Sequence, residues 1–138
     1  MADEMTKTKR TLAALRGQDV DRPPVSAWWH DFPREWSAAG LAEATLEAYR
    51  KYDWDFIKVN PRFCYYGEDW GAKYVIAAEP GQPVLTEPGV SAPEHLGRIK
   101  RLNVSKGAYG EQLESLRFKA VNPTFLLRVI KASPDWVV

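Results

Sequence analysis

Apolar positions repeat with a helical period in two early segments of the chain, residues 6–17 and 41–52. In the first segment the leucines fall on one side, Lys and Arg fall on the other, and Gly17 stands where a helix C-cap belongs. The second segment is the clearest helix, because one apolar face is opposed by charged residues. We expect its buried face to comprise Leu41, Thr45, Ala48 and Tyr52.

Two short apolar runs, residues 25–29 and 56–59, flank the second helix and predict strands. The first run does not alternate cleanly, which is typical of a parallel strand covered on both faces. Pro23 and Pro24 favour an extended chain at the start of the first run, and Asn60-Pro61 ends the second, because proline cannot donate to a central ladder. Strand, helix and strand with short connections form a βαβ unit, so we expect the two strands to be parallel neighbours.

The middle of the chain, residues 62–93, is rich in Gly, Pro, Tyr and Glu and predicts an elaborated loop beyond the strand ends. Short strands are expected within this loop at residues 73–77 and 84–86. A capping box with proline near its first turn, Ser91-Ala-Pro-Glu94, predicts a short helix over residues 93–99.

The last part of the chain predicts one further helix and then becomes harder to assign. Helical spacing resumes in residues 107–119 through Leu113 and Leu116. Asn122-Pro123 then interrupts the pattern before the apolar residues 125–130. We therefore assign no element beyond the helix.

The composition is that of an ordinary globular protein, with 138 residues, 45% hydrophobic and 27% charged. Nineteen basic residues face eighteen acidic ones, and this net charge of +1 gives no global field that would recruit nucleic acid or an anionic membrane. The single cysteine, Cys64, excludes an internal disulfide and fits a reducing compartment, so we expect the cytoplasm. Six Trp and six Tyr indicate either an aromatic-lined pocket or a dense core.

Three motifs, taken in their order and spacing, resemble the start of the uroporphyrinogen decarboxylase family: Leu12-Ala-Ala-Leu-Arg-Gly17, Asp21-Arg-Pro-Pro-Val25 and, in its divergent members, Glu68-Asp-Trp-Gly71. The resemblance is strongest over residues 6–117, and residues 118–138 diverge. It implies an α/β fold, the N-terminal portion of a (β/α)8 TIM barrel with its catalytic face at the carboxyl ends of the strands. Because a complete barrel takes roughly 250 residues, we expect one incomplete domain over residues 1–138, inactive by itself.

The activity that the resemblance implies is the cofactor-free decarboxylation of a tetrapyrrole or a related carboxylated molecule, as in porphyrin biosynthesis. The decarboxylases carry an Arg-Gln-Ala-Gly-Arg motif after the first strand, where this chain has Trp29-His30-Asp31-Phe32-Pro33-Arg34. Arg34 matches the second arginine only with one inserted residue, and the aspartate expected after the second strand is replaced by Asn60 or Pro61. These departures point to the divergent branch near the corrinoid-dependent methyltransferases.

Polar and aromatic residues just beyond the two predicted strands form the candidate site. His30 could donate a proton, because imidazole exchanges protons near neutral pH, and Asp31 could orient it or cap the following helix. The arginines could form bidentate contacts with a carboxylate or be solvated. The predicted site comprises His30 and Asp31 as catalytic residues and Arg34, Asn60, Arg62, Trp29 and Tyr65 as substrate-binding residues. No metal ligand is predicted in this chain.

Two alternatives remain open beside the decarboxylase. Methyl transfer would use zinc and a corrinoid, held by parts of a longer parent protein that follow this segment in the family. The other alternative is a non-catalytic fragment or oligomerising module, because two or three strands cannot close a barrel and their open edge could pair two chains as a homodimer. The expected partner is otherwise a small carboxylated molecule, with neither nucleic acid nor a membrane involved.

Overall fold

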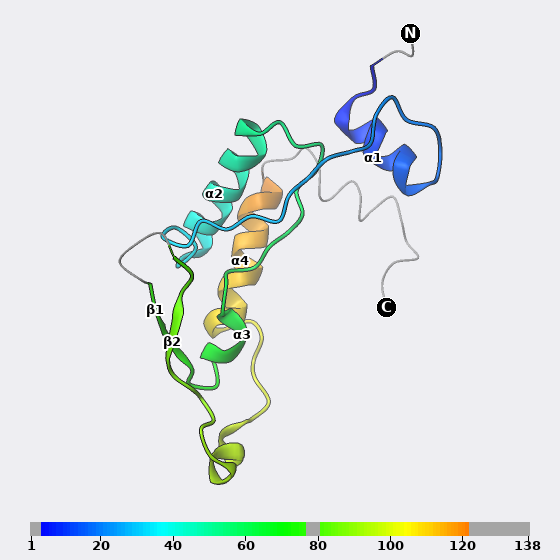
Figure 1. Ribbon diagram of the computed structural model, residues 1–138. Helices are drawn as coiled ribbons and strands as arrows, with labels where there is room; N and C mark the ends of the chain where they lie inside the picture. Colours follow the sequence, from blue (N-terminus) through cyan, green and yellow to red (C-terminus); the bar gives the residue numbers. More distant parts are fainter. Residues whose placement is uncertain (1–3, 77–80, 122–138) are drawn as a thin grey trace.

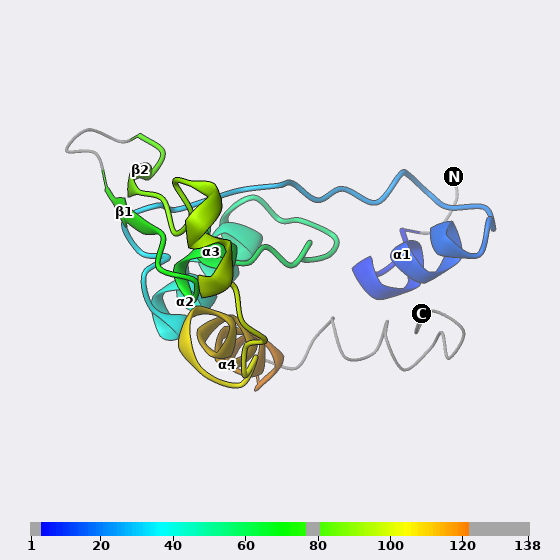
Figure 2. The ribbon, with the colours of Figure 1, turned by 90° about the horizontal axis from the view of Figure 1, so that it is seen from below.

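The computed structural model describes residues 4–76 and 81–121, which form helices and one small sheet. Its elements are α1 (Lys7–Leu15), α2 (Ala38–Lys51), α3 (Tyr65–Glu68), β1 (Lys73–Val75), β2 (Val84–Glu87), the 3-10 helix η1 (Pro93–Arg98) and α4 (Gly107–Val121). Helices α2 and α4 lie side by side, and α1 and the β1–β2 hairpin lie at opposite ends of the molecule (Figures 1 and 2). The predicted apolar segment 125–130 lies outside the described residues.

Helix α2 supplies most of the apolar core. It begins at Ser37, whose Oγ accepts a hydrogen bond from the Gly40 amide at 3.1 Å, a side-chain N-cap. Its buried residues are Ala38, Leu41, Ala42, Ala44, Thr45 and Ala48. The predicted face is confirmed except at Tyr52, which is 53% exposed because the helix ends one residue before it. The Tyr52 ring stacks on Trp54.

Helix α4 confirms the predicted helical spacing but buries a different face from the one its leucines suggest. Its buried positions are Ala108, Gln112, Ser115 and Lys119, which recur every three or four residues and therefore share one side of the helix. Leu113 and Phe118 are 42% and 44% exposed. The buried side is bonded to residues 60–62, through Gln112 and Lys119.

Residues 25–29 and 56–59 run side by side as extended segments without forming the predicted strands. Three hydrogen bonds join the first segment to residues 55–60 in a parallel sense. They run from the Asp55 amide to the Val25 carbonyl (2.8 Å), from the Lys58 amide to Ser26 Oγ (3.3 Å) and from Asn60 Nδ2 to the Trp29 carbonyl (2.7 Å). The prediction of neighbouring parallel segments is confirmed, and the prediction of a ladder is wrong. Only the first of these bonds is backbone to backbone, so side chains of the two segments take the place of the ladder.

The two segments also lack the cover that buried parallel strands need. Val25 and Trp28 are 53% and 57% exposed, so the first segment faces solvent on part of its surface. The sheet of the described residues is instead the antiparallel β1–β2 hairpin, which pairs Tyr74 with Leu85 and Val75 with Val84. The predicted strands near residues 73–77 and 84–86 are thereby found, and the (β/α)8 barrel stays a prediction.

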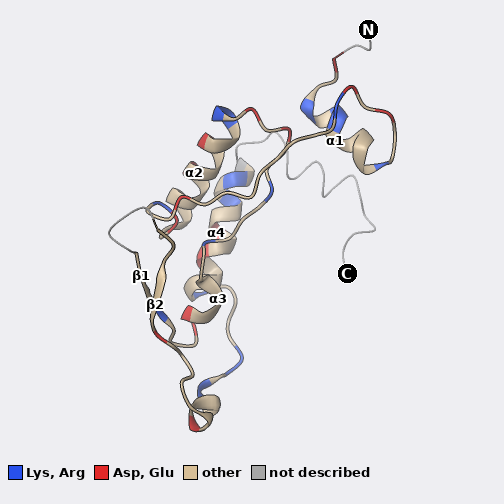
Figure 3. Cartoon of the chain, in the orientation of Figure 1, with Lys and Arg blue, Asp and Glu red and all other residues tan. Residues whose placement is uncertain are grey.

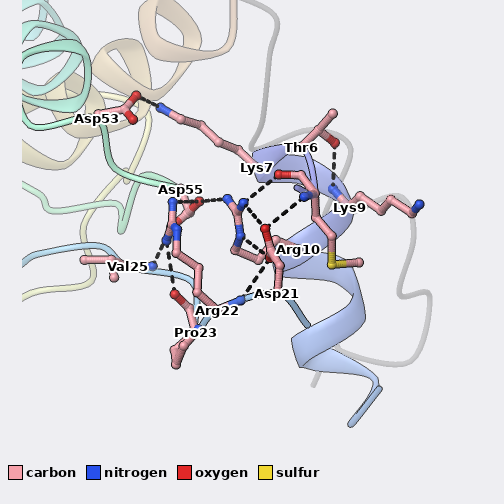
Figure 4. A network of polar contacts seen from close by, with 11 residues as sticks. Thr6, Lys7, Lys9, Arg10, Asp21, Arg22, Pro23, Val25, Asp53 and Asp55 are labelled. Atoms are coloured by element: carbon pink, nitrogen blue, oxygen red, sulfur yellow. Dashed lines mark hydrogen bonds and ion pairs between the residues drawn. The ribbon is translucent and has the colours of Figure 1, made fainter. Parts of the chain in front are cut away.

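Helix α1 is attached to the extended segments by charged side chains (Figure 4). Arg10, 2% exposed, donates to Asp21 and to Asp55, the second of these bonds measuring 2.6 Å. Asp55 is fully buried and also accepts from Arg22 and from the Val25 amide at 2.8 Å. Through these bonds the Asp21-Arg-Pro-Pro-Val25 motif and Asp55 hold α1 against the beginnings of the two extended segments.

The Glu68-Asp-Trp-Gly71 motif also has a structural role, at the junction of α3 and α4. Asp69 caps the start of α4, accepting from the amides of Ala108 (2.9 Å) and Tyr109 (3.2 Å). The indole Nε1 of Trp70 donates to the Lys100 carbonyl at 2.8 Å, which ties the long connection back to this turn. Gly71 has φ 92°, a conformation that favours glycine.

The predicted capping box before η1 is wrong. The N-cap residue is Ala92, one position later than expected, and it has no side chain that could accept a hydrogen bond. Ser91 Oγ instead contacts His95 Nδ1 at 3.1 Å. The short helix itself is present, with proline in its first turn as predicted.

Lys and Arg positions are interspersed with Asp and Glu positions along the described chain (Figure 3). None of the helices in residues 4–76 and 81–121 is both long and apolar enough to span a membrane. With a net charge of +1, a charged ligand would have to be attracted by a local group of charges.

Candidate functional site

The predicted catalytic histidine, His30, is paired with a buried glutamate five residues later. Its Nδ1 lies 2.8 Å from Oε1 and 3.0 Å from Oε2 of Glu35, whose side chain is 2% exposed. Glu35 also accepts from the backbone amides of Asp31 (2.8 Å) and Phe63 (3.2 Å). The carboxylate thus joins the turn after residues 25–29 to the segment after residues 56–59.

The other contacts of His30 define its tautomer. The indole Nε1 of Trp28 donates to His30 Nε2 at 2.9 Å, so Nε2 is the acceptor and Nδ1 carries the proton that Glu35 binds. The imidazole stacks on Phe32 at 5.5 Å between ring centroids and meets the edge of Phe63 at 5.7 Å. The His30 side chain is only 13% exposed. These contacts hold it in one orientation, in which Nε2 faces the indole N–H of Trp28.

Asp31, the second predicted catalytic residue, does not orient His30, because that place is taken by Glu35. Its Oδ1 accepts from the Arg34 amide at 3.3 Å, and its Oδ2 accepts from Arg34 Nε at 2.7 Å. The expectation that Asp31 caps the following helix is also wrong, because Ser37 caps α2. Asp31 instead closes the turn over residues 31–34.

Arg34 bridges this turn to helix α2. Its Nη1 donates to Glu47 at 2.6 Å, while its Nε is bound by Asp31. The carboxylates of Glu47 and Asp31 raise the pKa of the guanidinium above its usual range. Arg34 is 37% exposed, so it is still accessible to a ligand.

Three of the predicted residues, Trp29, Asp31 and Arg34, line one open cavity of about 580 Å³ beside the C-terminal end of α2. The rest of its lining is Glu47, Ala48, Arg50, Lys51 and Tyr52. Within the described part of the chain neither Arg50 nor Lys51 forms an ion pair, so the cavity has three basic side chains against two acidic ones. The apolar part of the lining comes from Trp29, Ala48 and Tyr52. Together with the excess of basic side chains, it suits an organic ligand that carries carboxylates.

The remaining predicted residues lie on the other side of the extended segments, towards α3 and α4. Arg62 is 3% exposed and sits over the Trp36 ring at 4.8 Å, with Nε bound by Glu111 at 3.0 Å and both Nη atoms bound by Glu68. Burial works against its charge, but the two carboxylates outweigh burial and raise the pKa. Its contacts are those of an internal crosslink.

Asn60 and Tyr65 also have internal partners. Asn60, 5% exposed, donates through Nδ2 to the Trp29 carbonyl, and its Oδ1 is buried without a hydrogen-bond partner in the described residues. The Tyr65 ring packs edge-on against Tyr109, with centroids 5.1 Å apart. The seven predicted residues are thus divided among the His30 pair, the open cavity and the junction with α4, and do not form one cluster.

Sequence reasoning missed two charged groups that the fold brings together, Glu35 and Lys119. Lys119 is 6% exposed and donates to the Asn60 carbonyl at 3.3 Å. Burial lowers the pKa of Lys119 to about 8, and the attraction of Glu35 offsets part of that effect. The only sequence signal for Glu35 is its position in a turn five residues after His30. No local sequence signal points to Lys119, because 89 residues separate it from His30.

No metal centre can be assigned within residues 4–76 and 81–121, where no three His, Cys, Asp or Glu side chains group together. Burial raises the pKa of the Cys64 thiol, which disfavours the thiolate form that ligates metals and attacks electrophiles. No family model matches the chain, and no curated protein or solved structure does so either.

Proposed function

We propose that the chain forms part of the catalytic face of a uroporphyrinogen decarboxylase-like cytoplasmic enzyme that acts on a carboxylated small molecule. The observation that carries this proposal is the open cavity in which Trp29, Asp31 and Arg34 meet Arg50 and Lys51. Two of these basic side chains have no carboxylate partner within the described residues, so a ligand carboxylate would be bound without displacing an existing ion pair.

The parallel run of residues 25–29 and 56–59 supports the barrel part of the proposal. Neighbouring parallel segments bring their carboxyl ends to the same edge, and functional residues of (β/α)8 barrels gather at that edge. His30 and Asn60 follow the two segments directly, and Glu35 bridges the turn after the first to Phe63 after the second. Further strands of a longer protein would then complete the edge.

His30 is the residue we propose for proton transfer in a decarboxylation. When the carbon–carboxylate bond breaks, carbon dioxide leaves and the bonding electron pair stays on the substrate, where a proton must be added to carbon. Protonated His30 could supply that proton from Nε2 while the Glu35 carboxylate stabilises the charge at Nδ1. In that state Nε2–H and the Trp28 indole N–H are both donors, so Trp28 would have to move away.

Binding of a polycarboxylated porphyrin to the chain tests the cavity. We expect its absorbance spectrum to change on binding, with an affinity that falls as salt is added. Replacing Arg50 and Lys51 with Gln should weaken binding about fivefold for each charge removed, on the order of 1 kcal/mol. Arg16→Gln, at an exposed position near the end of α1, is the matched control and should leave the affinity unchanged.

A longer parent protein tests the chemistry. It should convert uroporphyrinogen and lose activity with His30→Ala, while Trp28→Phe, which removes the indole N–H bond to Nε2 but keeps an aromatic ring beside Lys58, should retain turnover. Absence of uroporphyrinogen turnover by an intact, folded parent would overturn the decarboxylase. Stoichiometric zinc in that parent would favour corrinoid-linked methyl transfer instead.

A further inference from the structure

A second cavity, apolar and separate from the one proposed above, lies between α4 and the segment after residues 56–59. Its volume is about 260 Å³, and its apolar lining comes from Leu41, Val59, Pro61, Leu113 and Leu116. A dry apolar cavity of about 150 Å³ is large enough to hold benzene. This cavity therefore has room for one small apolar molecule.

The side chain of Lys119 reaches this cavity from the buried side of α4. An ammonium group has three hydrogens to donate, and in the part of the chain that the structure describes Lys119 has one acceptor, the Asn60 carbonyl at 3.3 Å. A buried ammonium with unfilled donors is costly, whereas a neutral amine needs fewer partners. The surroundings therefore favour the unprotonated, nucleophilic form of Lys119.

We propose that Lys119 is a carbonyl-reactive amine that binds a small apolar aldehyde as an imine inside this cavity. The amine nitrogen attacks the carbonyl carbon, and the nitrogen loses two hydrogens while the carbonyl oxygen leaves as water, so that a carbon–nitrogen double bond replaces the carbon–oxygen double bond. No oxidant or reductant is consumed. The hydroxyls of Tyr65 and Tyr109, whose side chains line the same cavity, can exchange protons during loss of water.

Three titratable residues, Glu35, Tyr65 and Tyr109, lie around the Lys119 amine or its cavity. Glu35 attracts the protonated form, while the side chains of Tyr65 and Tyr109 line the cavity. With its pKa lowered to about 8, Lys119 is ~25% unprotonated at about pH 7.5, against ~0.1% for a lysine at the ordinary value of 10.5. Free amine is thus available under mild conditions.

Reductive trapping with benzaldehyde and cyanoborohydride tests the proposal on the intact chain. Peptide mapping should locate one benzyl group on Lys119, labelled at least about tenfold faster than Lys100, an exposed lysine that serves as an internal control. Glyoxylate, an aldehyde that carries a carboxylate, should not show this preference, because the cavity lining is apolar.

Two variants test whether the Lys119 amine is the group that reacts. Lys119→Met should abolish the fast labelling, and Lys100→Met should leave it unchanged. Labelling of the native chain that is no faster at Lys119 than at Lys100 overturns the proposal, and this comparison holds even where Lys119→Met does not fold. Fast labelling that persists at another lysine in a folded Lys119→Met variant overturns it as well.

Discussion

At the scale of single residues, the candidate site is organised by buried charged and polar groups. Glu35 is almost inaccessible and accepts hydrogen bonds from His30, Asp31 and Phe63. A buried carboxylate is retained only where such donors replace its hydration. Glu35 is therefore the residue on which the orientation of His30 depends.

Replacing Glu35 with Gln should destabilise the chain by about 1–3 kcal/mol, because one carboxylate oxygen is exchanged for an amide group that cannot accept. Urea unfolding followed by circular dichroism measures this change. Glu43→Gln, at an exposed position of α2, is the control and should shift the stability by less than about 0.5 kcal/mol. Equal effects of the two substitutions would contradict the central role of Glu35.

The lowered pKa of Lys119 predicts a dependence of stability on alkaline pH. The unfolded chain holds a proton on this residue up to about pH 10.5, whereas the folded chain releases it near pH 8. The unfolded state binds more protons between these values, so the stability should rise from about pH 8 to pH 10.5, by roughly 3 kcal/mol in the limit. Urea midpoints that show no such rise relative to Lys119→Met would refute the shift.

Sequence alone anticipated some of the neighbours in the candidate site and missed others for a physical reason. Trp29, Asp31 and Arg34 lie near one another in sequence, so a local pattern was enough to group them around one cavity. Lys119 is brought to Asn60 only by the packing of α4, and no spacing along the chain encodes that contact. Arg62 could not be recognised as a crosslink before its partner Glu111 was placed beside it.

At the scale of elements, the attachment of α1 depends on one buried carboxylate, that of Asp55. Arg10 and Arg22 donate to it together with the Val25 amide, so three groups lose their acceptor if it is neutralised. The alanine and leucine side chains of α1 contribute little core, since Ala13 is its one fully buried apolar residue. Ionic contacts therefore replace apolar packing at this junction.

Asp55→Asn should destabilise the chain by about 3 kcal/mol and speed hydrogen exchange in α1, because buried charges lose their partner. Asp53→Asn is the matched control: Asp53 pairs with Lys7 but is 82% exposed, so its loss should cost less than about 1 kcal/mol. Hydrogen exchange measured by mass spectrometry distinguishes the two. Unchanged protection of α1 in Asp55→Asn would contradict this account.

Helices α1, α2 and α4 and the short strands β1 and β2 were predictable from sequence, whereas the prediction of two parallel strands was wrong. Capping residues and periodic apolar positions are local signals, and they placed α1, α2 and α4 close to their observed bounds. Residues 25–29 and 56–59 have strand-like composition, but a strand also needs a partner ladder and covered faces. Only one backbone hydrogen bond, from Asp55 to Val25, joins the two stretches, so their extended, parallel course was predictable while the absence of a ladder was not.

At the scale of the whole molecule, acid should unfold the chain through the same network. Arg10 holds the pKa of Asp21 well below its usual range, and hydrogen bonds from Arg22, Val25 and Arg10 lower that of Asp55 in spite of its burial. A lowered folded-state pKa contributes stability above the ordinary value of about 4, and this stability is lost as the pH falls further. Asp55→Asn should flatten the acid side of a stability profile measured by circular dichroism, and a profile that keeps its slope would contradict this.

The exposed apolar side chains predict self-association of the chain. Val25, Trp28, Leu113 and Phe118 are each between 42% and 57% exposed, and the extended segments leave an edge along which a second chain can pair. Sedimentation velocity at increasing concentration should show a dimer or larger species. A monomer at all concentrations that unfolds cooperatively would rule out the oligomerising module.

The contact between Gly107 and Asp69 has a consequence for how this sequence can change over evolutionary time. Gly107 has φ 62°, and a Cβ added there would lie 2.1 Å from Asp69 Oδ1, the carboxylate that caps α4. A larger residue at position 107 would therefore displace the cap, and a longer side chain at position 69 would press against the glycine. Among descendants of this sequence, the two positions should be inherited as a pair or replaced together, although 38 residues separate them.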